Sequence, residues 1–162
     1  MRTAIIIVAL LSVGSTALAA DPIYLDQMME MPLVTLQQQF PRLRGEGCYQ
    51  IGPDRFLQIE IAKKDRKPSR IVIASAPPCR KADEGPALDV RERIGVELGD
   101  STRDILEKMG RPDASAPPDA AFKKLGETEY FYICRITPGC SRHTSVFMRD
   151  GIVSAISTWY SD

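Results

Sequence analysis

Four cysteines, Cys48, Cys79, Cys134 and Cys140, constrain the fold of this chain more than any other feature. In an oxidising compartment, cysteines pair as disulfides, and each pair holds two segments at bridging distance. Four cysteines allow three pairings. Pro138-Gly139 lies between Cys134 and Cys140 and favours a tight turn that brings these two together. We therefore predict the pairs Cys134–Cys140 and Cys48–Cys79.

A metal site is the alternative explanation for these cysteines. Zinc sites use C-x2-C pairs or histidines at short spacing. The chain has a single histidine, His143, and no such cysteine pair. A redox C-x-x-C motif is also missing from the sequence. We therefore predict structural disulfides, with no metal ion and no cofactor.

The N-terminus has the pattern of an export signal. A positive start, Met1-Arg2, precedes an unbroken apolar run from Ala4 to Leu11, and Ala17-Leu18-Ala19 fits the small-x-small cleavage rule. The run is shorter than the roughly 20 residues of a membrane-spanning helix. We predict a signal peptide over residues 1–19 and a mature protein that is soluble in the periplasm, without a membrane anchor.

Charge excludes one class of partner. The chain has 21 basic and 21 acidic residues, a balance that argues against nucleic-acid binding. The charges are unevenly distributed, since residues 41–81 hold ten basic and four acidic residues, whereas residues 83–107 hold three basic and eight acidic. This asymmetry is suited to steering a charged protein partner. The alternative is two solvated surfaces that differ in sign.

Local patterns predict short helices and several strands. Ser101 and Asp104 form a capping-box pattern, and Gly110 is a typical stop, so we predict a helix over 102–109. A second short helix is expected over 35–40, before Pro41. Alternating or β-branched residues predict the strands 55–61, 70–74, 129–136, 144–148 and 152–160, the last two joined by a turn at Asp150-Gly151.

The two halves of the chain follow a similar plan. Each has a short helix, then a cysteine-bearing strand, then a hairpin, with a period of about 70 residues. We therefore predict an α+β fold of two tandem helix-plus-antiparallel-sheet units, in residues 20–82 and 83–162, with a linker or long loop over 75–89. Chance similarity between two short hairpins is the alternative.

Residues 99–112, Gly-Asp-Ser-Thr-Arg-Asp-Ile-Leu-Glu-Lys-Met-Gly-Arg-Pro, resemble the helix signature of the SmpA/OmlA (BamE-like) envelope proteins. The aromatic strand and the final hairpin are similar too, so the resemblance covers 98–160 and, more weakly, 33–75. The doubled plan with one bridge per half is similar to the secreted β-lactamase-inhibitor proteins. The chain differs from the BamE-like lipoproteins in lacking a lipobox cysteine. The resemblance implies a binding protein rather than an enzyme.

The sequence contains no recognisable catalytic constellation. His143 is next to Ser141 and Ser145 only in sequence, and we expect it in a surface loop. The carboxylates of Asp83-Glu84 and of Glu127 and Glu129 are close in sequence, which a solvated face explains. The chain has no Gly-rich phosphate loop, no H-E-x-x-H and no G-x-S-x-G. We predict that the protein is not an enzyme.

Aromatic residues near the C-terminus suggest a protein-binding surface. If Phe131 and Ile133 face the helices, alternation turns their neighbours to the open face of the sheet. We predict Tyr130, Tyr132 and Trp159 as anchors, with Arg135 and Arg142 at the rim. The predicted function is a non-catalytic protein that binds another periplasmic or secreted protein and inhibits or neutralises it. The alternative is a cell-envelope assembly or structural accessory protein.

Overall fold

The structure is a computed structural model and describes residues 21–133 and 142–160. Strands hold 41% of the described residues and helices 16%. The elements in chain order are β1 (Ile23–Tyr24), α1 (Leu25–Glu30), α2 (Leu33–Gln39), β2 (Glu46–Gly52), β3 (Arg55–Ile61), β4 (Pro68–Ala74), β5 (Asp83–Glu84), β6 (Val90–Arg91), α3 (Thr102–Met109), β7 (Ala114–Ala116), β8 (Thr128–Ile133), β9 (Arg142–Arg149) and β10 (Ile152–Tyr160).

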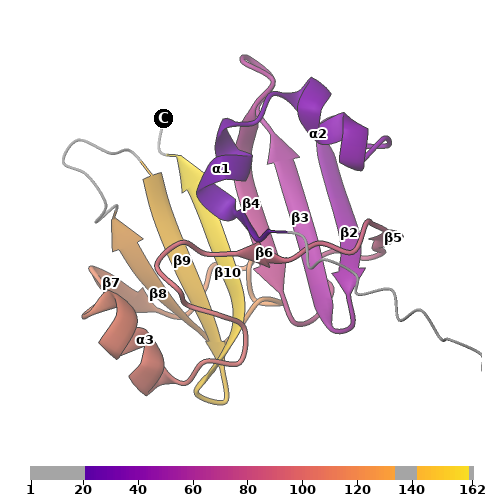
Figure 1. Cartoon of the computed structure of the whole chain (residues 1–162). Helices are drawn as coiled ribbons and strands as arrows, with labels where there is room; N and C mark the ends of the chain where they lie inside the picture. The colour runs from indigo at the N-terminus through magenta and orange to yellow at the C-terminus, as the bar shows by residue number, and fades with distance from the viewer. Residues whose placement is uncertain (1–20, 134–141, 161–162) are drawn as a thin grey trace, which may run out of the picture.

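One sheet of eight strands dominates the described residues, in the order β5-β2-β3-β4-β10-β9-β8-β7. Its neighbours are antiparallel except for β2 and β5, which run parallel. A small parallel sheet pairs β1 with β6. The central neighbours β4 and β10 come from opposite halves of the chain, and their ladder joins Arg70 to Trp159 and Ala74 to Ala155. The large sheet therefore runs through both halves without a break (Figure 1).

The prediction of an α+β fold with two tandem units is wrong, because the protein is mostly β and has one mixed eight-stranded sheet. Each half ends in a hairpin whose last strand would present unpaired backbone groups at a sheet edge. Pairing of β4 with β10 satisfies both edges at once. The linker or long loop predicted over 75–89 also contributes a strand, β5.

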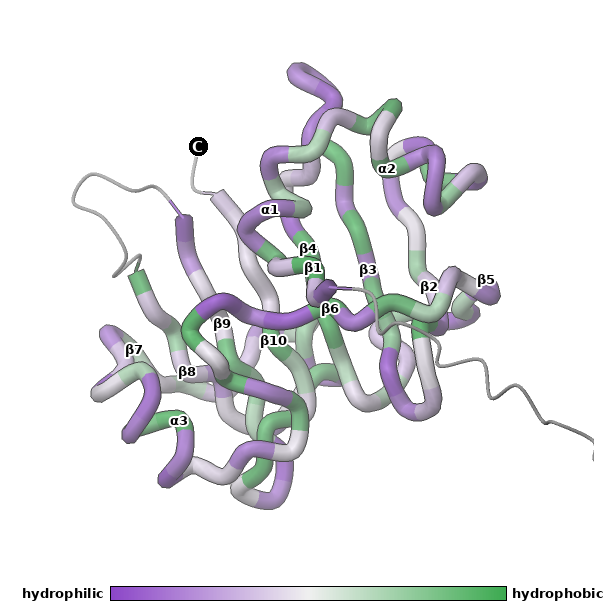
Figure 2. The backbone as a smooth tube through the Cα atoms, viewed as in Figure 1, coloured by the Kyte–Doolittle hydropathy of each residue, from purple (hydrophilic) through white to green (hydrophobic). Residues whose placement is uncertain are grey.

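All three helices lie on one face of the large sheet, which we call the covered face (Figure 1). α1 packs across β4 and β10. Strand alternation sends apolar residues to this face, and Figure 2 shows hydrophobic stretches along β3 and β4 with hydrophilic turns at their ends. The core under the helices includes Leu57, Ile59, Ile71, Ile73, Val146, Met148 and Ile156 from the strands, and Met28, Met29, Leu36 and Ile105 from the helices.

The helix and turn signals near the C-terminus are confirmed. Helix α3 spans Thr102–Met109, the Ser101 hydroxyl accepts from the Asp104 backbone N–H at 3.3 Å, and the Asp104 carboxylate accepts from the Ser101 N–H at 2.8 Å. Gly110 ends the helix with a φ of 75°. Asp150 and Gly151 have φ values of 53° and 77°, as a tight hairpin between β9 and β10 requires.

The disulfide between Cys48 and Cys79 is confirmed and ties β2 to the segment that follows β4. The predicted pair Cys134–Cys140 lies outside the described residues, as does the predicted signal peptide at 1–19. Within residues 21–133 and 142–160, no helix is long and apolar enough to span a membrane.

Candidate functional site

The face of the large sheet opposite the helices carries the candidate site, and we call it the helix-free face. It is turned away from the viewer in Figure 1. On β4, alternation sends Ile71 and Ile73 to the core under the helices, and Arg70, Val72 and Ala74 to the other side. The strand register aligns one residue from each of five neighbouring strands across this face: Glu60, Arg70, Trp159, His143 and Ile133.

Five side chains form a continuous patch along this row, which we call the aromatic strip: Arg70, Phe122, Phe131, His143 and Trp159. The His143 ring centroid lies 5.2 Å from that of Phe131 and 4.6 Å from that of Trp159. The guanidinium carbon of Arg70 lies 5.5 Å from the Trp159 centroid and 4.4 Å from that of Phe122. The strip thus joins a cation to stacked rings, an arrangement that stabilises the cation by cation–π attraction.

The segment between β7 and β8 packs on this face next to the strip. Phe122 and Leu125 contact a second hydrophobic cluster made of Val72, Ala74, Phe147 and Ala155. The Ser154 hydroxyl donates to the Leu125 carbonyl, and an Arg149 N–H donates to the Lys124 carbonyl at 2.9 Å. These contacts fix Phe122 against Arg70 and leave the strip itself only half-buried.

A small pocket of about 190 Å³ opens between this segment and the strip. Arg70 and Trp159 lie on its wall, with the hydroxyls of Ser145 and Ser157. Its lining also includes the carboxylates of Asp119 and Glu129.

Three polar atoms at this site are buried without a hydrogen-bond partner among the described residues: both ring nitrogens of His143 and the hydroxyl of Ser157, whose residue is 2% exposed. A buried group left unpaired costs roughly 1–3 kcal/mol of stability. Arg55 and Thr158 each have one such atom elsewhere. Ser157 lines the same pocket as Arg70, and His143 packs on Trp159 next to it, so this face holds several polar groups whose lack of a partner among the described residues needs an explanation.

Two of the predicted anchors face the wrong way. Tyr132 is 1% exposed and its hydroxyl donates to the Gly110 carbonyl at 3.3 Å, while Tyr130 packs against the core under the helices. Their neighbour Phe131 faces the strip instead. The expectation that Tyr130 and Tyr132 point to the open face is therefore wrong, because α3 and its Gly110 end cover the tyrosine side of β8. Trp159 does lie on the helix-free face.

Arg142 is not at a rim. It is 9% exposed, lies on the covered face, and forms an ion pair with Asp26 at 3.3 Å. Asp26 also pairs with Arg93 at 2.6 Å. Burial raises the pKa of the Asp26 carboxyl, but the hydrogen bond and charge of Arg93 and the charge of Arg142 outweigh it, so the pKa lies below its ordinary value of 3.8. Arg135, the other predicted rim residue, lies outside the described residues.

His143 was expected in a surface loop and lies instead on β9, where its ring packs against those of Phe131 and Trp159. Sequence patterns missed Arg70, Phe122 and Phe131 as site residues. The one local hint was Arg70, a charged residue that opens a β-branched strand. Its proximity to Trp159 depends on the pairing of β4 with β10, which joins positions 70 and 159.

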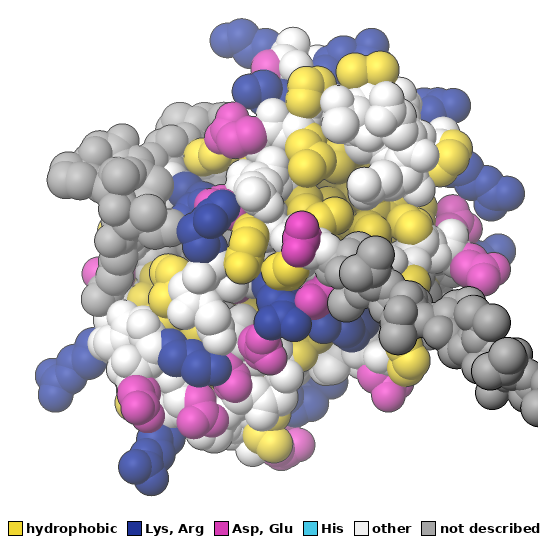
Figure 3. All heavy atoms as spheres, in the orientation of Figure 1, with side chains coloured by type: hydrophobic (Ala, Val, Ile, Leu, Met, Phe, Trp, Pro, Cys, Tyr) yellow, Lys and Arg dark blue, Asp and Glu magenta, His cyan; other side chains and the backbone are white. Residues whose placement is uncertain are grey.

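The charge asymmetry is partly neutralised within the fold. Arg42 of the basic stretch pairs with Asp83 of the acidic stretch at 3.9 Å, and Arg55 pairs with Asp89 at 3.7 Å. In Figure 3, Lys and Arg side chains gather at the edge near the turn between β3 and β4, while Asp and Glu side chains lie lower on the covered face. Part of the charge of the basic residues 41–81 and the acidic residues 83–107 is therefore paired within the protein and does not act on a partner.

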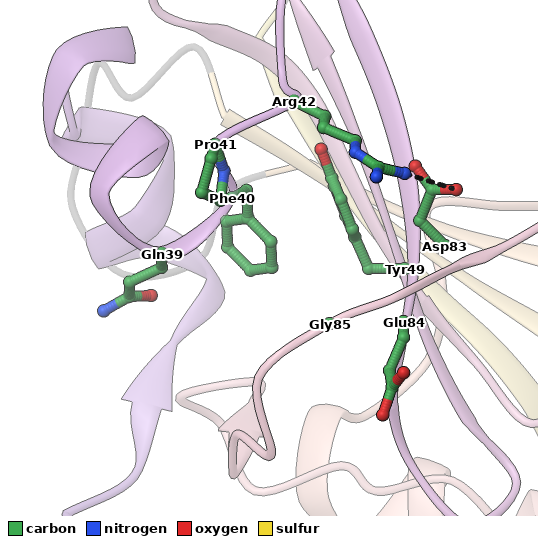
Figure 4. Close-up of a pocket in the computed structure, with 8 residues that line it drawn as sticks. All are labelled: Gln39, Phe40, Pro41, Arg42, Tyr49, Asp83, Glu84 and Gly85. Atoms are coloured by element: carbon green, nitrogen blue, oxygen red, sulfur yellow. Dashed lines mark ion pairs between the residues drawn. The ribbon is translucent and has the colours of Figure 1, made fainter.

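A second pocket, of about 390 Å³, lies at the β2–β5 edge of the sheet (Figure 4). Figure 4 shows Arg42 reaching over the Tyr49 ring to Asp83. Burial, followed by the Asp83 charge, raises the pKa of the Tyr49 hydroxyl. In this pocket Arg42 is already paired with Asp83. The Tyr49 ring packs against Phe40, and their ring centroids are 4.5 Å apart. This pocket therefore holds fewer unsatisfied groups than the strip.

No set of three or more His, Cys, Asp or Glu side chains within the described ranges is placed to bind a metal ion. The chain matches no protein-family model, no curated protein and no solved structure.

Proposed function

We propose that this chain is a non-catalytic exported protein that binds another protein through its helix-free face, and so inhibits or neutralises it. The observation that carries the proposal is the aromatic strip, in which half-buried Trp159, Phe131 and Arg70 lie together on a face without helices.

The composition of the strip supports protein recognition. Trp and Arg are enriched among the interface residues whose loss costs most binding energy, and such residues cluster at the centre of an interface. The strip rests on a continuous sheet, and the rings of Phe122 and Trp159 both lie near the Arg70 guanidinium. A surface that is already ordered loses little conformational entropy when it binds.

The position of His143 supports binding rather than catalysis. General acid–base and triad chemistry need an imidazole nitrogen within hydrogen-bond reach of a nucleophile or of an orienting carboxylate. In the described part of the chain, both His143 nitrogens lack a hydrogen-bond partner, and the ring packs against those of Phe131 and Trp159. We assign His143 to the packing of the strip.

Export is supported by the apolar run at residues 4–11 and by the disulfide, since structural disulfides persist in oxidising compartments. The Cys48–Cys79 bond attaches the segment after β4 to β2 and so limits its motion beside the helix-free face. We place the protein in the periplasm.

The test is capture of a partner by the immobilised wild-type protein from a periplasmic extract, followed by affinity measurements on variants. Trp159→Ala and Phe131→Ala should each weaken binding by about 2 kcal/mol, close to thirtyfold. Val34→Ala is the matched control, because Val34 is an apolar residue of α2 that is 68% exposed on the other side. The proposal is contradicted if Trp159→Ala and Phe131→Ala both bind with wild-type affinity, or if only the Val34→Ala control loses binding. Either result would mean that another surface binds the partner.

A further inference from the structure

Arg70 is firmly held but lacks a partner for its N–H groups. Its guanidinium carbon lies 4.4 Å from the Phe122 ring centroid and 5.5 Å from that of Trp159. Within the described residues, the group has no hydrogen-bond acceptor and no carboxylate oxygen within 4.0 Å. Stacking uses the faces of a guanidinium and leaves its five N–H donors free at the edge. Arg70 is therefore ready to bind a planar acceptor.

The Ser157 hydroxyl is a second unsatisfied group in the same pocket. The residue is 2% exposed, lies on β10 opposite Val72, and has no hydrogen-bond partner in the described part of the chain. It lines the 190 Å³ pocket together with Arg70. Among the described residues, Arg70 and Ser157 therefore bring unpaired donors to the same pocket.

A carboxylate has the chemistry that both groups require. Its two oxygens accept paired N–H bonds from a guanidinium, and a remaining lone pair accepts from a hydroxyl. The pocket is smaller than the roughly 300–1,000 Å³ of sites that hold a whole small molecule, so it suits one side chain.

The other carboxylates in the pocket favour a ligand that a protein presents. Asp119 and Glu129 also line the space, and they repel a freely diffusing anion. The Glu60 carboxyl lies opposite Arg70 on β3, and burial raises its pKa although the charge of Arg70 lowers it. Binding of a carboxylate there therefore needs favourable contacts outside the pocket to offset the repulsion, and a side chain on a docked partner has such contacts.

We propose that the pocket between Arg70 and Ser157 receives a Glu or Asp side chain of the protein partner. This inference rests on the proposed function, that the helix-free face binds a protein. The acidic side chain would lie against Arg70 while the partner's neighbouring residues cover Trp159 and Phe131.

The experiment uses a phage-displayed library of random peptides as the probe, selected on the wild-type protein and on variants. Wild type should enrich peptides with Glu or Asp at one fixed position next to an apolar residue. Arg70→Gln should weaken binding of the enriched peptides at least tenfold, and Arg70→Lys should restore only part of it, since lysine lacks the planar fork. Arg103→Gln, an equal charge change on exposed α3, should leave binding unchanged.

Ser157→Ala separates recognition from stability. Removing an unsatisfied hydroxyl should keep or raise the unfolding midpoint, whereas affinity for the acidic peptides should fall several-fold. Equal affinity in Ser157→Ala would remove this residue from the site and overturn the two-group pocket.

The outcomes distinguish the two proposals. If wild type enriches no peptides, or if Trp159→Ala leaves binding intact, the proposed protein-binding face is wrong. If the peptides depend on Trp159 but carry no acidic residue, or ignore Arg70→Gln, only the carboxylate pocket is wrong. A titration with sodium acetate, followed by the NMR signal of the Arg70 side chain, tests a free anion. Saturation below about 1 mM acetate would assign the pocket to a small molecule instead.

Discussion

The two faces of the large sheet are built from alternate residues of the same strands, yet they differ in how completely their charged side chains are paired. On the covered face, Asp26 pairs with both Arg93 and Arg142, and Glu30 accepts from the Tyr160 hydroxyl and pairs with Lys67. On the helix-free face, Arg70 has aromatic neighbours but no anion within 4.0 Å among the described residues.

This difference indicates that the two faces have different roles, one in stability and the other in binding. The covered face buries most of the large apolar side chains and supplies the stability of the sheet. The stability gained on the covered face offsets the cost of a stacked cation, a buried hydroxyl and a histidine on the other face that have no hydrogen-bond partners among the described residues. Groups that destabilise a free protein can strengthen its complexes, because the partner satisfies them.

The largest expected effect separates two neighbours on β8. Tyr132→Ala should lower the free energy of unfolding by about 4 kcal/mol, because it leaves a large cavity in the core. Phe131→Ala, one position away on the helix-free face, should cost about 1 kcal/mol while it weakens partner binding. Urea unfolding of both variants measures the comparison. Equal losses of stability would mean that the two faces contribute alike.

The disulfide should have the next largest effect. The Cys48→Ser/Cys79→Ser double variant should lose about 3.7 kcal/mol of unfolding free energy, the entropic gain expected for closing a loop of this length. The predicted bond between Cys134 and Cys140 closes a much shorter loop, so the corresponding double variant should lose only about 2.4 kcal/mol. Chemical denaturation measures both. A loss from the first variant no larger than from the second would contradict the loop-length argument.

The smallest of these effects tests the polar contacts of the covered face. Asp26→Asn should cost about 2 kcal/mol at pH 7, because it leaves the buried Arg142 without its anion. The pKa of Asp26 is lower in the folded protein than its ordinary 3.8, so its contribution is complete above that value and is lost as pH falls through the folded pKa.

The measurement is unfolding of wild type and Asp26→Asn at pH 7, 5 and 3. The loss of unfolding free energy in Asp26→Asn relative to wild type should be equal at pH 7 and pH 5, and smaller at pH 3. Asp119→Asn on the helix-free face is the control, and we expect a change within about 0.5 kcal/mol because Asp119 is exposed. A difference between wild type and Asp26→Asn that grows as pH falls would contradict the assigned direction of the pKa shift.

Local signals in the sequence predicted the elements that depend on neighbouring residues. The capping box at Ser101 and Asp104 predicted α3, and Asp150-Gly151 predicted the last hairpin. The alternation of Leu57, Ile59 and Ile61 predicted β3. Each of these signals acts over a few residues, through hydrogen bonds, backbone conformation or side-chain alternation within one segment.

The sequence by itself determined where α3 and the long strands β3, β4, β8, β9 and β10 lie and which residues alternate on them, because propensity and turn chemistry are local. It also predicted the pairing of Cys48 with Cys79, as the pair that remains once Pro138-Gly139 favours Cys134–Cys140. Only the tertiary structure decided that β4 pairs with β10, that Tyr132 is buried while Phe131 is not, and that Arg70 meets Trp159. The physical reason is that alternation separates two faces but does not say which one the helices cover, and the pairing of two distant hairpins depends on contacts that no local pattern records.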